Sequence, residues 1–174
     1  MGVPAGSGRA VPDDRVHRYG VTCSWSGSTG SGYDNYDRRH RATAPPAAAA
    51  LDLAADPAFR GDAVLLNPEQ LLVLAAASCQ LLSFLAVAAR ARLDVVAYED
   101  RAEAVMPEST RPCRITEITL RPRITVRAPA TEARVRRLTE VAHRECFIAN
   151  SITSRVVLEP TVEVVEAGEA PPLP

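Results

Sequence analysis

The 174-residue sequence contains no lysine, so all 20 of its basic side chains are arginines. Together with many alanines and 14 prolines, this is typical of GC-rich coding, and we attach no mechanistic meaning to it. The sequence also has almost no net charge, with a formal value of -1 at pH 7. Because nucleic acids and anionic membranes attract proteins mainly through an excess of positive charge, we expect neither as a partner.

An export signal and an uninterrupted membrane span are also missing. Residues 1–10 have no apolar stretch of the kind that a signal peptide needs. The longest apolar run covers residues 71–89 and is followed by Arg90 and Arg92. It is interrupted by Ser78, Cys79, Gln80 and Ser83. Its length would suffice to cross a bilayer, but the interruptions favour a helix buried in a soluble core, and we expect a cytoplasmic protein.

Cysteine is scarce, with four residues in the chain: Cys23, Cys79, Cys113 and Cys146. Four are too few for a disulfide scaffold of this length, and in a reducing compartment cysteines are catalytic, metal-binding or simply buried. No Cys-x-x-Cys pair is present, and His143, one helical turn before Cys146, has no further ligands nearby. We therefore expect no metal and no other cofactor.

Hydrophobic and charged residues make up 47% and 24% of the chain, as in an ordinary soluble domain. We expect one domain over residues 15–167, between tails at 1–14 and 168–174. Alternating patterns and turn residues predict strands at residues 17–25, 33–43, 95–105, 114–127 and 156–165. Residues 45–50 read as a linker and 56–62 as a loop. With two helices, the order is β-β-α-β-β-α-β, an α+β fold.

Both helices have clear start signals, and each carries a cysteine. The first begins with Asn67 as N-cap and Pro68 in the first turn, and the second with Thr131 as N-cap. On the first helix, one face contains Leu72, Ala75, Cys79, Leu82, Ala86 and Ala89. On the second, it contains Val135, Leu138, Ala142 and Cys146. Two inward-facing thiols on separate helices suit a dithiol/disulfide couple, with plain packing as the alternative; Cys23 and Cys113 are expected to be packing residues.

Two cysteine-containing segments resemble motifs of a known family. Residues 67–72 (NPEQLL) followed by 75–79 (AAASC) resemble the Asn-Pro-Glu-x-Leu and Ala-x-x-x-Cys signature of the OsmC/Ohr proteins, the osmotically inducible protein C and organic hydroperoxide resistance proteins. Residues 142–151 (AHRECFIANS) resemble the second-cysteine segment of that family. Residues 24–27, 56–62 and 93–100 also fit. The chain is thus similar to the OsmC-like subgroup over residues 17–165.

The resemblance implies an intertwined homodimer with a long central helix wrapped by sheet. It also implies a cysteine-based peroxide reductase for organic hydroperoxides, lipid hydroperoxides among them, which a dithiol or lipoyl-type reductant regenerates. Cys79 would be the peroxidatic thiol and Cys146 the resolving thiol. Arg38 would activate Cys79, with Arg39, Arg41 and Arg60 as rivals. Glu69 would hold that arginine; its alternative role is a charge that complements the helix dipole.

The chemistry and the spacing of these residues make one further prediction. A thiolate attacks the O–O bond, and a guanidinium beside a cysteine favours its ionised form. Glu69 and Cys79 are ten residues apart on one helix, about 15 Å along its axis. One arginine head group cannot touch both, so either Glu69 comes from the partner subunit or the arginine moves between the two. Each option favours a site at a dimer interface.

Gln80 departs from the family pattern, in which an aromatic residue or histidine often follows the first cysteine. If Gln80 lines the pocket, substrate preference shifts away from bulky organic peroxides. Two other functions stay open. One is a redox sensor or small-ligand-binding protein of the same fold with little turnover, and the other is a structural dimer with buried, unreactive thiols.

Overall fold

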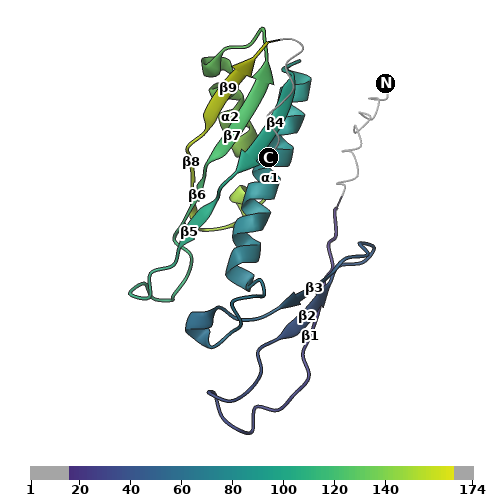
Figure 1. The fold of residues 1–174 in the computed structure, drawn as a ribbon, viewed down its shortest axis with the longest axis vertical. Coiled ribbons are helices and arrows are strands. Elements are labelled where there is room, and N and C mark those ends of the chain that lie inside the picture. Colours follow the sequence, from purple (N-terminus) through teal and green to yellow (C-terminus); the bar gives the residue numbers. More distant parts are fainter. Residues whose placement is uncertain (1–15, 167–174) are drawn as a thin grey trace, which may run out of the picture.

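The computed structural model describes residues 16–166 (Figure 1), so the predicted tails at 1–14 and 168–174 lie outside the described residues. The fold is α+β, as the sequence predicts. In chain order the strands and helices are β1 (Thr22–Ser24), β2 (His40–Thr43), β3 (Ala50–Leu53), α1 (Pro68–Arg90), β4 (Val95–Asp100), β5 (Glu103–Val105), β6 (Glu117–Leu120), β7 (Pro122–Arg127), α2 (Glu132–Glu145), β8 (Arg155–Leu158) and β9 (Thr161–Val165). Two short 3-10 turns, η1 (Pro57–Phe59) and η2 (Ala149–Ser151), complete the order.

Both helices begin where the sequence predicts. The Asn67 side chain accepts a hydrogen bond from the Gln70 backbone N–H at 2.8 Å, and the Gln70 side chain accepts one from the Asn67 N–H at 3.1 Å. This reciprocal pair is a capping box, which satisfies two otherwise free donors at the start of α1. At the start of α2, the Thr131 hydroxyl accepts from the Arg134 N–H at 3.3 Å.

The three predicted strands that follow α1 are each broken into two. β4, β7 and β9 form one three-stranded sheet, and β5, β6 and β8 form another. In both sheets the middle strand is antiparallel to one neighbour and parallel to the other. Two of the three breaks fall beside Pro122 and Pro160, which have no N–H to donate to a strand ladder, and the third, between β4 and β5, falls at residues 101–102. At the break, the Arg121 guanidinium joins the carboxylates of Glu103 (2.7 Å) and Glu159 (2.9 Å).

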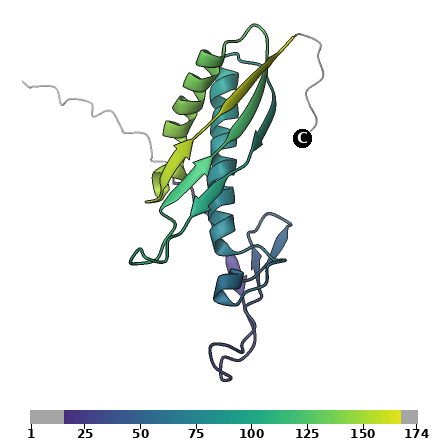
Figure 2. The same ribbon diagram turned by 60° about the vertical axis from the view of Figure 1, so that its left-hand side comes forward.

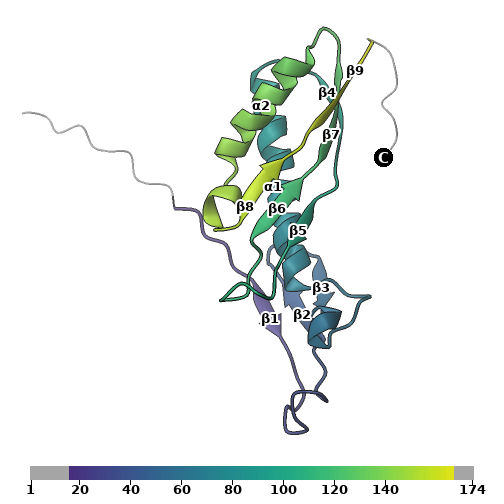
Figure 3. The ribbon, with the colours of Figure 1, turned by 90° about the vertical axis from the view of Figure 1, so that its left-hand side faces the viewer.

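The two helices pack together on one face of these sheets (Figures 2 and 3). α1 is long enough to contribute to two clusters of buried side chains. One cluster comprises Phe84, Val87, Ala88, Leu93, Ile124, Val126, Val135, Leu138 and Ala142. The other comprises Ala76, Ile115, Ile118 and Leu120. The core therefore runs along the length of α1 and fixes its position against the sheet.

The sequence predicted the wrong buried face for α1. The buried positions are Ala76, Gln80, Phe84, Val87 and Ala88. Leu82, on the predicted face, is 64% exposed, and Cys79 is half-buried. Because α1 is apolar almost all round, the periodicity could not select a side, and contacts with α2 and the sheet select it instead.

α1 is also the one helix within residues 16–166 whose length and hydropathy would allow it to cross a membrane. This is a statement of length and composition only, and the core helix of a soluble protein meets the same criterion.

The N-terminal strands form a separate antiparallel sheet in the order β1-β2-β3. It lies beyond the N-terminal end of α1, away from the main sheets (Figures 1 and 3). β1 and β2 are shorter than the predicted strands at 17–25 and 33–43. β3 was not predicted, because its Ala-rich start reads as a linker; pairing with β2, with Leu53 opposite His40, makes it a strand. The Asp56–Asp62 segment contains η1.

Candidate functional site

The structure brings the two predicted thiols together. Cys79 lies in the middle of α1, and Cys146 follows the last turn of α2 and is 1% exposed. Both are free cysteines. The Cys146 thiol donates a hydrogen bond to the Cys79 sulfur. The structure therefore brings the two thiols together at one site, whereas their catalytic roles stay predictions.

The segment that follows α2 folds back over this pair. The Ile148 backbone N–H points at the Cys79 sulfur at 3.5 Å, and the Ala149 N–H at the Cys146 sulfur at 3.4 Å. The Asn150 side chain donates to the Cys146 carbonyl at 2.9 Å and thereby holds the turn. Ser83, four residues after Cys79 on α1, also donates to the Cys79 sulfur. Sequence analysis missed Ser83, although the spacing of four already places it beside Cys79 on a helix.

The pKa values of the two thiols are shifted in opposite directions. Burial by itself raises the pKa of Cys79, but the hydrogen bonds that its sulfur accepts from Cys146, Ile148, Ser83 and Phe147 outweigh burial and lower the pKa below its ordinary value. Burial, together with the hydrogen bond that Cys146 donates to Cys79, raises the pKa of Cys146 to about 11. Since the thiolate is the reactive form, Cys79 is prepared to attack, and Cys146 keeps its proton.

Alkylation should report this difference directly. The rate of Cys79 alkylation by iodoacetamide is expected to rise with pH through a midpoint below that of an ordinary cysteine, because hydrogen bonds to its sulfur lower its pKa. Replacing Ser83 with alanine removes one donor to the sulfur and should move the midpoint upward. Mass spectrometry of the alkylated Cys79 peptide between pH 5 and 10 measures both midpoints. A midpoint at or above the ordinary value would contradict the thiolate assignment.

A groove with a volume of about 710 Å³ lies alongside Cys79. Its walls include Ala75, Leu82, Ala86, Phe147 and Ile148, with Arg90, Arg144 and Glu145 among the charged residues of its lining. Gln80 does not line it: the side chain is buried between the helices, so the expected effect of Gln80 through pocket lining does not apply. An apolar groove beside a reactive group suits a ligand with an apolar body.

Arg38 lies at another place in the chain, in the segment before β2. Its side chain is buried, with 9% exposed, and its guanidinium carbon lies 4.7 Å from the ring centroid of Tyr33 and 4.0 Å from that of Tyr36. It donates to the backbone carbonyls of Tyr33 (2.6 Å) and Tyr36 (3.0 Å). No carboxylate within residues 16–166 forms an ion pair with Arg38. The charge is thus held by aromatic faces and carbonyls and remains available to an anion.

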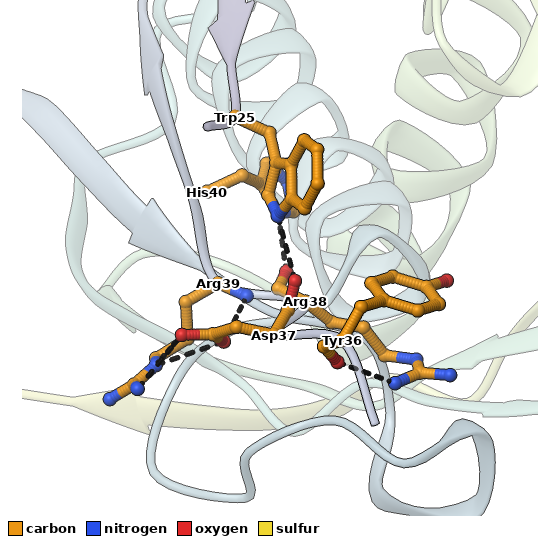
Figure 4. A network of polar contacts seen from close by, with 6 residues as sticks. All are labelled: Trp25, Tyr36, Asp37, Arg38, Arg39 and His40. Carbon is orange, nitrogen blue, oxygen red and sulfur yellow. Dashed lines mark hydrogen bonds and ion pairs between the residues drawn. The ribbon is translucent and has the colours of Figure 1, made fainter. Parts of the chain in front are cut away.

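The rival arginines are all exposed and already paired. Arg39 makes a two-pronged pair with Asp37, at 2.9–3.1 Å. Figure 4 shows its guanidinium extending away from that of Arg38, which lies beside Tyr36. Arg41 pairs with Asp52 and Arg60 with Asp34, each at 2.9 Å. Of the four candidates, Arg38 alone combines burial with an uncompensated charge, which favours it as the activating residue.

Glu69 shares a pocket with Arg38, and Cys79 does not. This pocket has a volume of about 430 Å³, lies at the N-terminal end of α1, and is also lined by Trp25 and Phe59. None of its lining residues lines the groove beside Cys79. The structure therefore places Arg38 and Glu69 at one location and the thiols at another within a single chain. That separation is the one expected from the ten-residue spacing of Glu69 and Cys79 on the helix.

The described residues contain no group of three or more histidine, cysteine or acidic side chains that could hold a metal ion.

The structure is that of an α+β domain in which a long helix and a second helix each bring one thiol to a common site. A family model described as OsmC-like protein matches residues 61–161, more than half of the chain, so the chain belongs to the OsmC family. No curated protein matches it.

Solved structures match the fold across most of the chain. An OsmC-like protein of unknown function from Vibrio cholerae has 24% identity and a TM-score of 0.76, with 84% of this chain and 100% of that chain covered. The organic hydroperoxide resistance protein OsmC from Legionella pneumophila has 18% identity and a TM-score of 0.65, covering 87% and 100%. An organic hydroperoxide resistance protein from Elizabethkingia anophelis has 16% identity and a TM-score of 0.66, covering 87% and 99%. At these identities the likeness shows the fold.

Proposed function

We propose that this OsmC-family protein is a thiol-dependent peroxidase that reduces organic hydroperoxides, lipid hydroperoxides among them, and protects the cytoplasm against oxidative stress. One observation carries the proposal: two free thiols from separate helices, Cys79 and Cys146, lie under the turn that follows α2, at the edge of an apolar groove. Two of the similar structures belong to proteins named for organic hydroperoxide resistance, which supports the same chemistry.

The reaction uses the two thiols in sequence. The Cys79 thiolate attacks the outer oxygen of the hydroperoxide, the O–O bond breaks, and the alkoxide takes a proton and leaves as an alcohol. Cys79 is now a sulfenic acid. The Cys146 sulfur attacks the Cys79 sulfur, the S–O bond breaks, and the hydroxide leaves as water with the proton of Cys146. A dithiol or lipoyl-type reductant then supplies two electrons and two protons to restore both thiols.

The working unit that we propose is a homodimer, in which Arg38 and Glu69 of one protomer meet Cys79 and Cys146 of the other. The free charge of Arg38 in a pocket apart from the thiols supports this arrangement. Uncovered apolar side chains support it too: Leu74, Leu82 and Leu85 on α1 are exposed, and Phe147 beside the thiol groove is 80% exposed. Covering such a surface in water is favourable in proportion to the apolar area removed.

A free-thiol count with intact mass tests the chemistry. After one equivalent of cumene hydroperoxide, the four free thiols of the reduced protein should fall to two, and peptide mapping should place the bond between Cys79 and Cys146. Survival of all four thiols would rule out the peroxidase and leave the structural dimer. If the bond forms but a dithiol donor drives no repeated turnover, the protein is instead a redox sensor. Equal rates with hydrogen peroxide and cumene hydroperoxide would contradict the organic substrate class.

A further inference from the structure

Gln80 is a polar side chain in a place where an apolar one would be expected. It directly follows Cys79 on α1 and is 0% exposed. Its Nε2 donates to the backbone carbonyl of Thr139 on α2 at 3.2 Å, while its Oε1 is buried and accepts no hydrogen bond from any residue of the described chain. Leaving a buried carbonyl without a donor is costly. The Gln80 amide therefore destabilises the core through its unpartnered Oε1 and contributes one hydrogen bond between the helices through its Nε2.

That bond lies where it controls the geometry of the thiol pair. Thr139 is seven residues before Cys146, so the two lie about two turns apart on nearly the same face of α2. On α1, Gln80 and Cys79 are neighbours separated by about 100° of rotation. A hydrogen bond from Gln80 to the α2 backbone thus fixes how far α1 is rotated and shifted relative to α2. Other polar contacts between α1 and α2 or its flanks are the Arg90–Glu145 ion pair, the bond from Arg134 to the Ala91 carbonyl and the Ile148 N–H on the Cys79 sulfur, whereas the Gln80 bond joins the buried middle of the two helices.

Disulfide formation is sensitive to that rotation. Two cysteines can be bridged only when their Cα atoms lie within a narrow range, about 4.4–6.8 Å, and their Cβ atoms point at each other. A rotation of α1 about its axis would carry the Cys79 sulfur out of reach of Cys146. The apolar packing of α1 against α2 in the first core cluster also opposes such a rotation, and the Gln80 bond adds a directional contact one residue from Cys79. Misplacement by about 1 Å is enough to slow a positioned reaction by up to about a hundredfold.

We propose that Gln80 is a positioning residue that locks α1 against α2, so that Cys79 and Cys146 are held ready to form their disulfide. The proposal rests on the proposed function for its physiological meaning. The step it controls is the second one, in which the Cys146 sulfur replaces the hydroxide on the oxidised Cys79 sulfur and water leaves. Attack of Cys79 on the peroxide also draws on the donors beyond the end of α2 that contact its sulfur, so this first step is expected to slow less than the second rather than to stay unchanged.

The variant Gln80→Met tests this assignment. Methionine has a similar length, and it removes both the donor and the unpartnered acceptor, so the melting temperature should change little. The control is Leu81→Met, a near volume-conserving change at the next residue of the same helix. Two measurements are made on each protein: the equilibrium constant for the Cys79–Cys146 disulfide in mixtures of reduced and oxidised dithiothreitol, and the rate of each step after mixing with cumene hydroperoxide.

For Gln80→Met we expect the disulfide equilibrium constant to fall about tenfold and the second step to slow by a similar factor. The first step should slow by a smaller factor, because the donors at Cys146 and Ile148 move away from the Cys79 sulfur as well. A sulfenic acid at Cys79 should accumulate and be trapped by dimedone. Leu81→Met should match wild type. Unchanged disulfide equilibrium in Gln80→Met would overturn the positioning role whatever the peroxide does. If the wild-type protein forms the disulfide in dithiothreitol mixtures but does not react with peroxide, the proposed function is overturned. In that case a lowered disulfide equilibrium constant in Gln80→Met still supports the positioning role.

Discussion

Replacing Cys79 with serine is expected to reduce the rate of cumene hydroperoxide reduction by about a thousandfold or more. A serine hydroxyl is not ionised near neutral pH, and its oxygen cannot accept a second oxygen as sulfur does in forming a sulfenic acid. Because Cys79 is half-buried and serine is nearly the same size, the fold should be retained. Peroxide consumption with a dithiol donor, measured beside the melting temperature, checks both statements.

The matched control for this variant is Cys113→Ser. Cys113 is exposed in the segment between β5 and β6 and does not line the groove beside Cys79. Its replacement should leave the peroxidase rate at the wild-type value. If Cys79→Ser still turned over peroxide while Cys113→Ser did not, the reactive thiol would have been assigned to the wrong cysteine. If neither change had an effect, thiol chemistry would not explain the activity.

Mixing two inactive variants is expected to restore activity if the site is shared between protomers. Arg38→Met removes the guanidinium and should slow the reaction by about a hundredfold, the usual effect of losing one charge-stabilising group. A heterodimer of Arg38→Met with Cys79→Ser contains one site in which both residues are intact. Random reassortment of equal amounts, by unfolding and refolding together, should therefore recover about one quarter of the wild-type activity.

The control for this mixture is Cys79→Ser with Cys146→Ser. These two thiols contact each other within one chain, so no heterodimer of these variants contains an intact pair. Disulfide-dependent turnover should stay absent. Absence of recovery in the Arg38→Met and Cys79→Ser mixture, with heterodimers demonstrated by mass, would place Arg38 and Cys79 in the same chain. A movement of the N-terminal segment would then be required to bring them together.

The position of Glu69 suits a role beside Arg38 better than a role beside Cys79. The two side chains line the same pocket, but no ion pair joins them, and α1 carries Glu69 about 15 Å from the thiols. A carboxylate that lines the same pocket as a buried guanidinium can orient it if their side chains meet, because a carboxylate offers a two-pronged match to a guanidinium. Its position in the first turn of α1 also suits the helix dipole, so both interpretations from the sequence are compatible with its place in the fold.

The sequence by itself determined the features that depend on neighbouring residues. The caps at Asn67 and Thr131 were predictable because a cap is made by a side chain and a backbone N–H only a few positions away. The two helices, the approximate positions of most strands and the α+β class followed from short periodic patterns. The family was also recognisable, because its motifs around Cys79 and Cys146 are continuous in the chain. Within those motifs the two cysteines could be named, although not yet shown to touch.

Only the tertiary structure decided the features that depend on distant parts of the chain. The side of α1 that is buried, and with it the place of Gln80, was set by α2 and the sheets, since an all-round apolar helix carries no preference of its own. β3 exists because β2 is available to pair with it. Arg38 could be separated from Arg39 only by burial and by the absence of a carboxylate beside it in the described chain. The acidity of Cys79 likewise comes from donors at residues 83, 146, 147 and 148, which meet only after the chain has folded.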